Sequence, residues 1–322
     1  MNARWLCRIL PVLMAILVID GQAHALQTRR PLNILFIGNS HTYFNDLPGV
    51  FRRIASSSGR TTPNVNSSAF GRYTLLDHLK NARTLRAIDY GWGAYHKPWD
   101  FVVLQEHSAI PAWAEDNAQH RHQFETACTQ LYDRIKLHNP DAKVVLFETA
   151  AWNGAYWRSM EISDTSIGRN ATDMQDRVRK WCAYTAYTYV PTHCASTRKN
   201  DLKVAFVGDA WERNYNNPNR IMLHAADYYH PNYAGTYLGA LVMYATIYNE
   251  KTQRIGYAGM LNATTAGYLQ RIAMAGNTIK PKAYKTQKVE GKTSALIIPG
   301  ITGVCLLLIL IWYARQCKTN LK

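Results

Sequence analysis

The chain has 322 residues and a net charge of +15 at pH 7, from 37 Lys and Arg against 22 Asp and Glu. Its six cysteines include no Cys-x-x-Cys pair, which argues against a zinc ribbon or a thioredoxin-type site. A positive balance of this size suits a nucleic acid, acidic glycans or anionic lipid head groups as partners, or solubility alone.

The N-terminal end has the layout of a targeting segment. Arg4 and Arg8 precede an apolar run over residues 9–19, and small residues follow at positions 23–25. This pattern predicts a secretory signal peptide over residues 1–25. An uncleaved anchor is the alternative, although the apolar run is short for a membrane span.

The C-terminal end predicts a single-pass membrane anchor. Residues 295–314 are apolar and uncharged, long enough to cross a bilayer as a helix, and the tail over 315–322 is basic. A charged tail favours a retained anchor over a GPI signal. The Lys-rich linker over 279–294 carries more cations than the tail, but a signal peptide commits a long domain to translocation largely regardless of charge. We therefore expect the domain outside the cytoplasm, near glycans and head groups, with no nucleic acid as partner.

Residues 26–278 form the remaining domain and alternate short apolar runs with amphipathic segments. In chain order the pattern predicts a strand over 33–37, a helix over 47–57, a strand over 62–67, a helix over 75–88, a strand over 101–105, a helix over 119–137, a strand over 143–148, a helix over 173–187, a strand over 204–207 and a closing helix over 232–248. Strands that alternate with helices pair in parallel through right-handed crossovers. The sequence therefore predicts an α/β fold, a three-layer doubly wound sheet of about five parallel strands.

Ligands of such sheets bind beyond the carboxyl ends of the strands. The side chains that follow the five predicted strands are therefore expected to face one cleft. Away from that cleft, Cys182 and Cys194 are predicted to close a short disulfide loop in an oxidising compartment, with Cys128 as a buried free thiol.

Two segments carry the residues of a serine nucleophile and its base. Ser40 follows the first strand after Gly38, which permits a tight bend, and precedes a helix start that stabilises negative charge. Asp227 and His230 lie three apart on a late turn, so the carboxylate can orient the imidazole as the base that a serine needs. His224 is an alternative base, and either segment taken alone is most often an ordinary turn.

Taken together, the segments resemble the SGNH (GDSL-like) hydrolases. Gly38-Asn39-Ser40-His41-Thr42 is similar to their nucleophile block, and Asp227-x-x-His230-Pro231 is similar to their final block. Gly71 falls at the place of the glycine of the second block, and Gln105 at the place of the asparagine of the third. The resemblance implies the flavodoxin-like SGNH fold, with an oxyanion hole formed by the N–H groups of Ser40 and Gly71 and the Gln105 amide, which offers the same NH₂ donor as asparagine.

The resemblance also implies an activity. It indicates a serine hydrolase of ester bonds, often acetyl groups on carbohydrate, with Ser40, Asp227 and His230 as triad and no metal or organic cofactor. An O-acyltransferase on a surface glycan and a catalytically silent glycan-binding module of the same fold are the alternatives. The candidate substrate contacts near the strand ends are His41, His107, Glu148 and Trp152.

Overall fold

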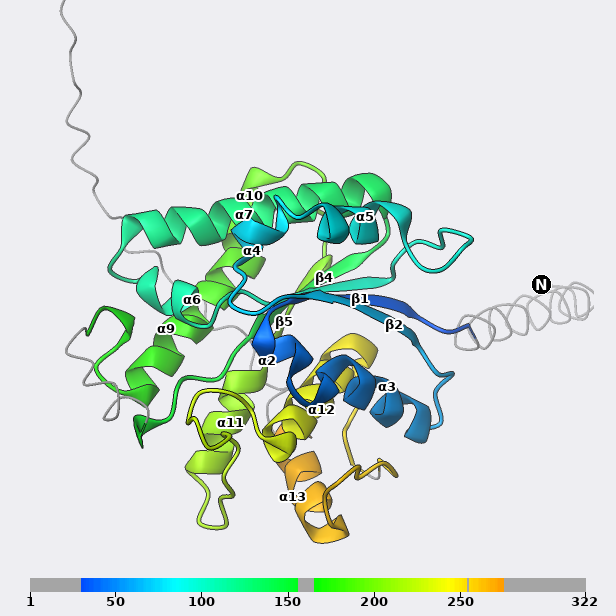
Figure 1. Ribbon diagram of the computed structural model, residues 1–322. Coiled ribbons are helices and arrows are strands. Elements are labelled where there is room, and N and C mark those ends of the chain that lie inside the picture. Colours follow the sequence, from blue (N-terminus) through cyan, green and yellow to red (C-terminus); the bar gives the residue numbers. More distant parts are fainter. Residues whose placement is uncertain (1–29, 156–164, 254, 275–322) are drawn as a thin grey trace, which may run out of the picture. The chain divides into compact units, whose positions relative to one another are not determined.

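The computed structural model describes residues 30–155, 165–253 and 255–274 (Figure 1). The predicted signal peptide (1–25), linker (279–294), membrane span (295–314) and tail (315–322) lie outside the described residues. Among the described residues, none of the helices has the length and apolar character that a membrane span requires.

Five strands form one parallel sheet in the order β2-β1-β3-β4-β5. The strands are β1 (Asn33–Gly38), β2 (Asn64–Ala69), β3 (Phe101–Leu104), β4 (Lys143–Glu148) and β5 (Leu202–Phe206). They lie within two residues of the predicted ones, so the predicted parallel sheet is confirmed. All residues of β1 and β3 are buried, which explains why these strands are continuous apolar runs.

Alternate side chains of the strands enter two separate cores, which gives the domain three layers. Leu35, Val102 and Val144 belong to one core, whereas Phe36 and Val103 belong to the other. Two sets of helices cover the two faces of the sheet (Figure 1). The first set is α4 (Leu75–His78), α5 (Ala82–Tyr90), α6 (Ala109–Trp113), α7 (Ala118–His138), α9 (Ala171–Tyr184) and α10 (Val190–His193). The second set is α3 (Leu47–Ser57), α11 (Val207–Tyr215), α12 (Tyr233–Tyr248) and α13 (Ala263–Met274).

Several helices differ from the prediction. The segment 75–88 is split into α4 and α5, because the Asn81 side chain accepts the N–H groups of Arg83 and Thr84 and so begins a new helix. The segment 173–187 passes from α9 into a π-turn, Thr185–Tyr189, before α10. The sequence did not predict α2 (Ser40–Tyr43), the 3₁₀ turns η1 (Phe44–Asp46) and η2 (Thr165–Ile167), α6, α10, α11 or α13. Because α13 follows α12, the predicted closing helix over 232–248 is not the last helix of the described residues.

The predicted Cys182–Cys194 disulfide is wrong. Both cysteines are free and buried, as is Cys128. The Sγ atom of Cys194 points to the Thr129 carbonyl of α7 at 3.9 Å, whereas Cys182 packs in the core from α9. The helical turns between the two cysteines thus direct the thiols to different partners.

The direction in which the chain adds strands to the sheet reverses between β1 and β3. From β1 the chain runs through α3 to the edge strand β2, and from β3 it runs through α6 and α7 to β4 on the other side. The connections leave these two neighbouring strands in opposite directions, which opens a crevice at their carboxyl ends. The segments after Gly38 and Leu104 therefore lie side by side, joined by the N–H of Gln105 to the carbonyl of Ile37 at 2.8 Å.

Candidate active site

Ser40 is placed at the crevice by the turn from β1 into α2. The Asn39 side chain caps α2 by accepting the N–H of His41 at 3.1 Å. Gly38 is required because a Cβ atom there would collide with the side chains of Thr42 and Gln105. Ser40 itself is 8% exposed, so its hydroxyl is shielded but accessible.

The structure brings the three predicted triad residues together. His230 Nε2 lies 2.9 Å from Ser40 Oγ, and His230 Nδ1 lies 2.6 Å from Asp227 Oδ2. The other oxygen, Asp227 Oδ1, accepts the backbone N–H groups of Tyr229 at 3.0 Å and His230 at 2.9 Å. The carboxylate therefore bonds one atom of the ring and the backbone of the loop that carries it.

The electrostatics of the site fix the tautomer of His230. Burial would raise the pKa of Asp227, but hydrogen bonds from the His230 ring and from the two backbone N–H groups lower it below its ordinary value. The carboxylate is therefore ionised and accepts a proton-bearing Nδ1. With Nδ1 directed at Asp227, Nε2 is the ring nitrogen that faces the Ser40 hydroxyl and can accept its proton.

Gln105 is not available as the predicted oxyanion donor. Its Nε2 donates to Asn39 Oδ1 at 2.9 Å and to the Glu106 carbonyl at 2.6 Å, and its Oε1 accepts Asn39 N–H and the Thr42 hydroxyl, both at 2.8 Å. The residue is fully buried, so both amide hydrogens are committed inside the protein. We correct this prediction: Gln105 braces the turn that holds the nucleophile.

The other two predicted donors are the backbone N–H groups of Gly71 and Ser40. Gly71 lies on an exposed turn after β2, and the Phe70 N–H bonds the Gly38 carbonyl at 3.1 Å, which ties this turn to the end of β1. Within the described residues, neither Gly71 N–H nor Ser40 N–H has a hydrogen-bond partner. Both groups are therefore free to bind an oxygen.

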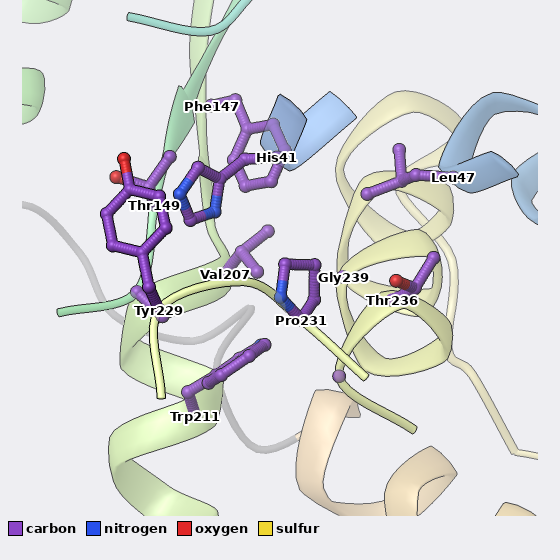
Figure 2. Close-up of a pocket in the computed structure, with 12 residues that line it drawn as sticks. His41, Leu47, Phe147, Thr149, Val207, Trp211, Tyr229, Pro231, Thr236 and Gly239 are labelled. Atoms are coloured by element: carbon purple, nitrogen blue, oxygen red, sulfur yellow. The ribbon is translucent and has the colours of Figure 1, made fainter. Parts of the chain in front are cut away.

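The structure places His41, a predicted substrate contact, beside the triad, with its ring centroid 5.5 Å from that of His230. Figure 2 shows its ring turned into a pocket that Tyr229, Pro231 and Trp211 also line, with a cavity of about 20 Å³. Burial lowers the pKa of His41 to about 3. His41 is thus a neutral ring packed behind the triad.

Glu148 is not a substrate contact. Its carboxylate is fully buried and accepts the N–H groups of Gly208 at 2.7 Å and Asp209 at 3.2 Å, at the start of α11. Burial, followed by the nearby charge of Asp209, raises the pKa of Glu148 well above its ordinary value. Its role is to join β4 to α11.

Trp152 and His107 remain near the crevice. Trp152 donates from Nε1 to Ser108 Oγ at 3.1 Å and lines a cleft of about 170 Å³. His107 is half-buried, and its Nδ1 accepts the Ala109 N–H at 3.4 Å. Burial and then the charge of Arg72 lower the pKa of His107, so the ring is neutral and carries its proton on Nε2.

The alternative base, His224, is excluded by its contacts. Its Nδ1 bonds the Tyr215 hydroxyl at 2.7 Å, and its Nε2 bonds the Ala151 carbonyl at 3.2 Å. Burial lowers its pKa to about 4. Both ring nitrogens are occupied away from Ser40.

Two aromatic residues that the sequence did not indicate surround the base. Phe44 stacks on the His230 ring at 4.1 Å between centroids and 3° between planes, and Tyr229 meets the same ring edge-on at 4.6 Å and 89°. Phe44 lies only four residues after the nucleophile, but nothing in the local sequence indicates a contact with a loop so distant in the chain.

Comparison with known proteins supports the fold. No family model and no curated protein sequence matches this chain. Among solved structures, a DUF4886 family protein from Bacteroides uniformis matches with a TM-score of 0.56 and 13% identity, over 76% of this chain and 94% of that chain. The chain therefore shares its fold with that protein.

Two weaker matches complete the comparison. A protein assigned as a GDSL-like lipase, from Parabacteroides merdae, has a TM-score of 0.44 and 11% identity, over 67% of this chain and 96% of its own. A carbohydrate esterase family 3 protein from Talaromyces cellulolyticus has a TM-score of 0.40 and 13% identity, over 66% and 94%. At such identities the likeness concerns the fold alone.

Proposed function

We propose that this chain is a serine hydrolase that cleaves ester bonds through an acyl-enzyme on Ser40. The observation that carries the proposal is the unbroken hydrogen-bond chain from Asp227 through His230 to Ser40, with links of 2.6 and 2.9 Å. This geometry favours an enzyme over a catalytically silent module, because a binding role needs no base aligned on a serine.

The reaction proceeds in two steps of the same kind. Ser40 Oγ attacks the ester carbonyl while His230 Nε2 takes its proton, and His230 then gives that proton to the leaving alcohol. Asp227 balances the charge of the transient imidazolium. In the second step His230 removes a proton from water, the water oxygen attacks the acyl carbon, and the proton returns to Ser40 as the acid leaves.

For the oxyanion hole we propose the N–H groups of Ser40 and Gly71 with His107 as the third donor, in place of Gln105. His107 follows β3 within the expected third block, and it is neutral with its proton on Nε2. Within the described residues that Nε2 has no hydrogen-bond partner, in contrast to the Gln105 amide. Donors of this kind typically contribute about 3–4 kcal/mol each to the transition state.

For the substrate we propose a carbohydrate ester, with an acetyl or other short acyl group. A cleft of about 170 Å³, whose lining includes neither Ser40 nor His230, is lined by aromatic rings such as Trp152 and Tyr215, together with polar groups such as Asn153 and Glu212. Aromatic faces combined with a few polar groups are typical of a ligand pocket. The Asn153 N–H bonds the Tyr228 carbonyl at 3.1 Å, which connects this cleft to the loop that carries the base.

For the location we propose an ectodomain outside the cytoplasm, on a single-pass anchor. Support comes from the two end segments of the sequence, which lie outside the described residues. In sealed membranes, protease added to the cytoplasmic side should leave the domain intact. Cleavage from that side would overturn the proposed orientation.

Release of p-nitrophenol from p-nitrophenyl acetate tests the proposed activity. Ser40→Ala and His230→Ala should each abolish most of the rate, and the double variant should lose no more than either alone, because the residues act as a unit. Losses that multiply in the double variant would refute the triad. Adding a sugar acceptor distinguishes transfer from hydrolysis, since transfer yields an acetylated sugar.

A further inference from the structure

We infer that the turn Phe44–Asn45 is a clamp that positions His230 over Ser40, with Phe44 and Asn45 as positioning residues. The inference rests on the proposed function, in which His230 is the base. It joins two independent contacts that reach the base loop from the segment that carries the nucleophile.

The first contact holds the plane of the His230 ring. Phe44 covers one face of that ring at 4.1 Å and 3°, a parallel stack, while Tyr229 meets it edge-on. Asp227 holds only Nδ1, so the carboxylate alone leaves the ring free to tilt about that bond. A flat partner on one face removes this freedom and keeps Nε2 directed at Ser40.

The second contact holds the backbone that follows the base. Asn45 Nδ2 donates to the Pro231 carbonyl at 2.9 Å and to Thr236 Oγ1 at 3.0 Å. Asn45 has a φ of +51°, in the left-handed region that asparagine tolerates better than most residues. The turn thus aims both amide hydrogens of Asn45 at the base loop and the first turn of α12.

The base loop needs an external support because it is open to solvent and strained. The Asp227 side chain is 47% exposed, and Tyr228 has a φ of +59°, which is unfavourable for an aromatic residue. By contrast, Ser40, Phe44 and Asn45 belong to one short segment, α2 followed by η1. The nucleophile and both contacts therefore keep a fixed mutual geometry, and the clamp sets the distance between Nε2 and Oγ.

The expected effect is catalytic rather than structural. A misplacement of about 1 Å in a catalytic pair costs roughly 10²-fold in rate. Phe44→Leu keeps an apolar side chain but removes the flat ring, whereas Phe44→Tyr keeps it. Asn45→Gly keeps the left-handed backbone and removes only the two hydrogen bonds, so it separates the clamp from the turn.

The test compares the rate of Ser40 labelling by a fluorophosphonate probe, together with kcat and KM for p-nitrophenyl acetate. We expect Phe44→Leu and Asn45→Gly to lower the labelling rate and kcat by roughly tenfold or more, with KM nearly unchanged. Phe44→Tyr should keep a rate near wild type. Asp46→Asn is the matched control, because Asp46 caps α3 by accepting Gly49 N–H and does not touch the base loop.

The outcomes separate the two proposals. Labelling of the wild type that is absent in Ser40→Ala supports Ser40 as the nucleophile. If Phe44→Leu and Asn45→Gly then label as fast as the wild type, the proposed positioning role of Phe44 and Asn45 is wrong. A Phe44→Tyr variant as slow as Phe44→Leu would also overturn it, since the flat ring would not be the cause. If the wild type does not label at all, the proposed function fails, and this inference fails with it.

Discussion

The buried carboxyl of Glu106 makes the stability of the protein depend on pH in a predictable way. Glu106 lies directly before His107, is 4% exposed, and accepts the N–H groups of Leu75 at 3.1 Å and His107 at 2.7 Å through Oε1. Within the described residues its Oε2 has no partner. Burial raises the pKa of Glu106 to about 8, although the two backbone hydrogen bonds oppose the rise.

The sign and size follow from proton linkage. In the unfolded chain Glu106 titrates near pH 4.5, whereas in the fold it keeps its proton up to about pH 8. The folded state therefore holds more protons between these values, and its stability falls as pH rises through them. With 1.36 kcal/mol per pKa unit, the loss between pH 5.5 and 8.5 is about 3 kcal/mol.

Glu106→Gln isolates the contribution of the Glu106 proton to stability, because the amide keeps the Oε1 acceptor and the shape of the side chain but does not titrate. The free energy of unfolding would be measured by urea denaturation with tryptophan fluorescence at pH 5.5 and 8.5. We expect the wild type to lose about 3 kcal/mol relative to the variant across this range. A difference that stays constant with pH would show that Glu106 does not carry a raised pKa, and the account of its burial would be wrong.

Three further predictions follow from the site and the core. His107→Ala should lower kcat for ester hydrolysis by roughly 10²–10³ with little change in KM. Gln105→Ala should instead lower the free energy of unfolding by about 3 kcal/mol or more, because it removes a fully bonded buried amide. A loss of kcat in Gln105→Ala but not in His107→Ala would restore Gln105 as the oxyanion donor. From pH 7.5 to pH 5 the wild type should lose about 2 kcal/mol of its free energy of unfolding relative to His41→Gln. The reason is that a histidine with a folded pKa of about 3 takes up a proton on unfolding once the pH is below about 6.5. Free energies of unfolding that change with pH in parallel for the two proteins would contradict this. Peptide mapping of the unreduced protein should recover Cys182 and Cys194 as free thiols, and a linked peptide would contradict the structure.

The inner strands of the sheet were predictable from sequence because they are buried on both faces. The segment 143–148 is almost entirely apolar, and the sequence located it to the residue. The end of β5 was not predictable in the same way. The apolar run continues to Val207, but the structure begins α11 there, because Glu148 of the neighbouring strand accepts the N–H groups of Gly208 and Asp209. A long-range carboxylate thus decides a local boundary.

Local sequence features likewise located Ser40, Asp227 and His230, whereas long-range contacts decided the role of Gln105. Ser40, Asp227 and His230 come together because each follows a feature that the sequence records: a strand end, and a three-residue spacing on a turn before a helix. For Gln105 the sequence records that an amide is present but not which acceptors it has, and its partners Asn39 and Thr42 lie on another strand's connection.

A donor becomes available to a substrate only when the fold leaves it unpaired. Gln105, directly after β3, is held by four hydrogen bonds to the nucleophile turn and to its own backbone neighbour, whereas His107, two residues later, is half-buried. The glutamine that stands where the resemblance to the SGNH hydrolases implies an asparagine therefore does not offer a free donor. The longer stem lets the amide bond Asn39 and Thr42 of the Ser40 turn, which is why we propose His107 rather than Gln105 as the third donor.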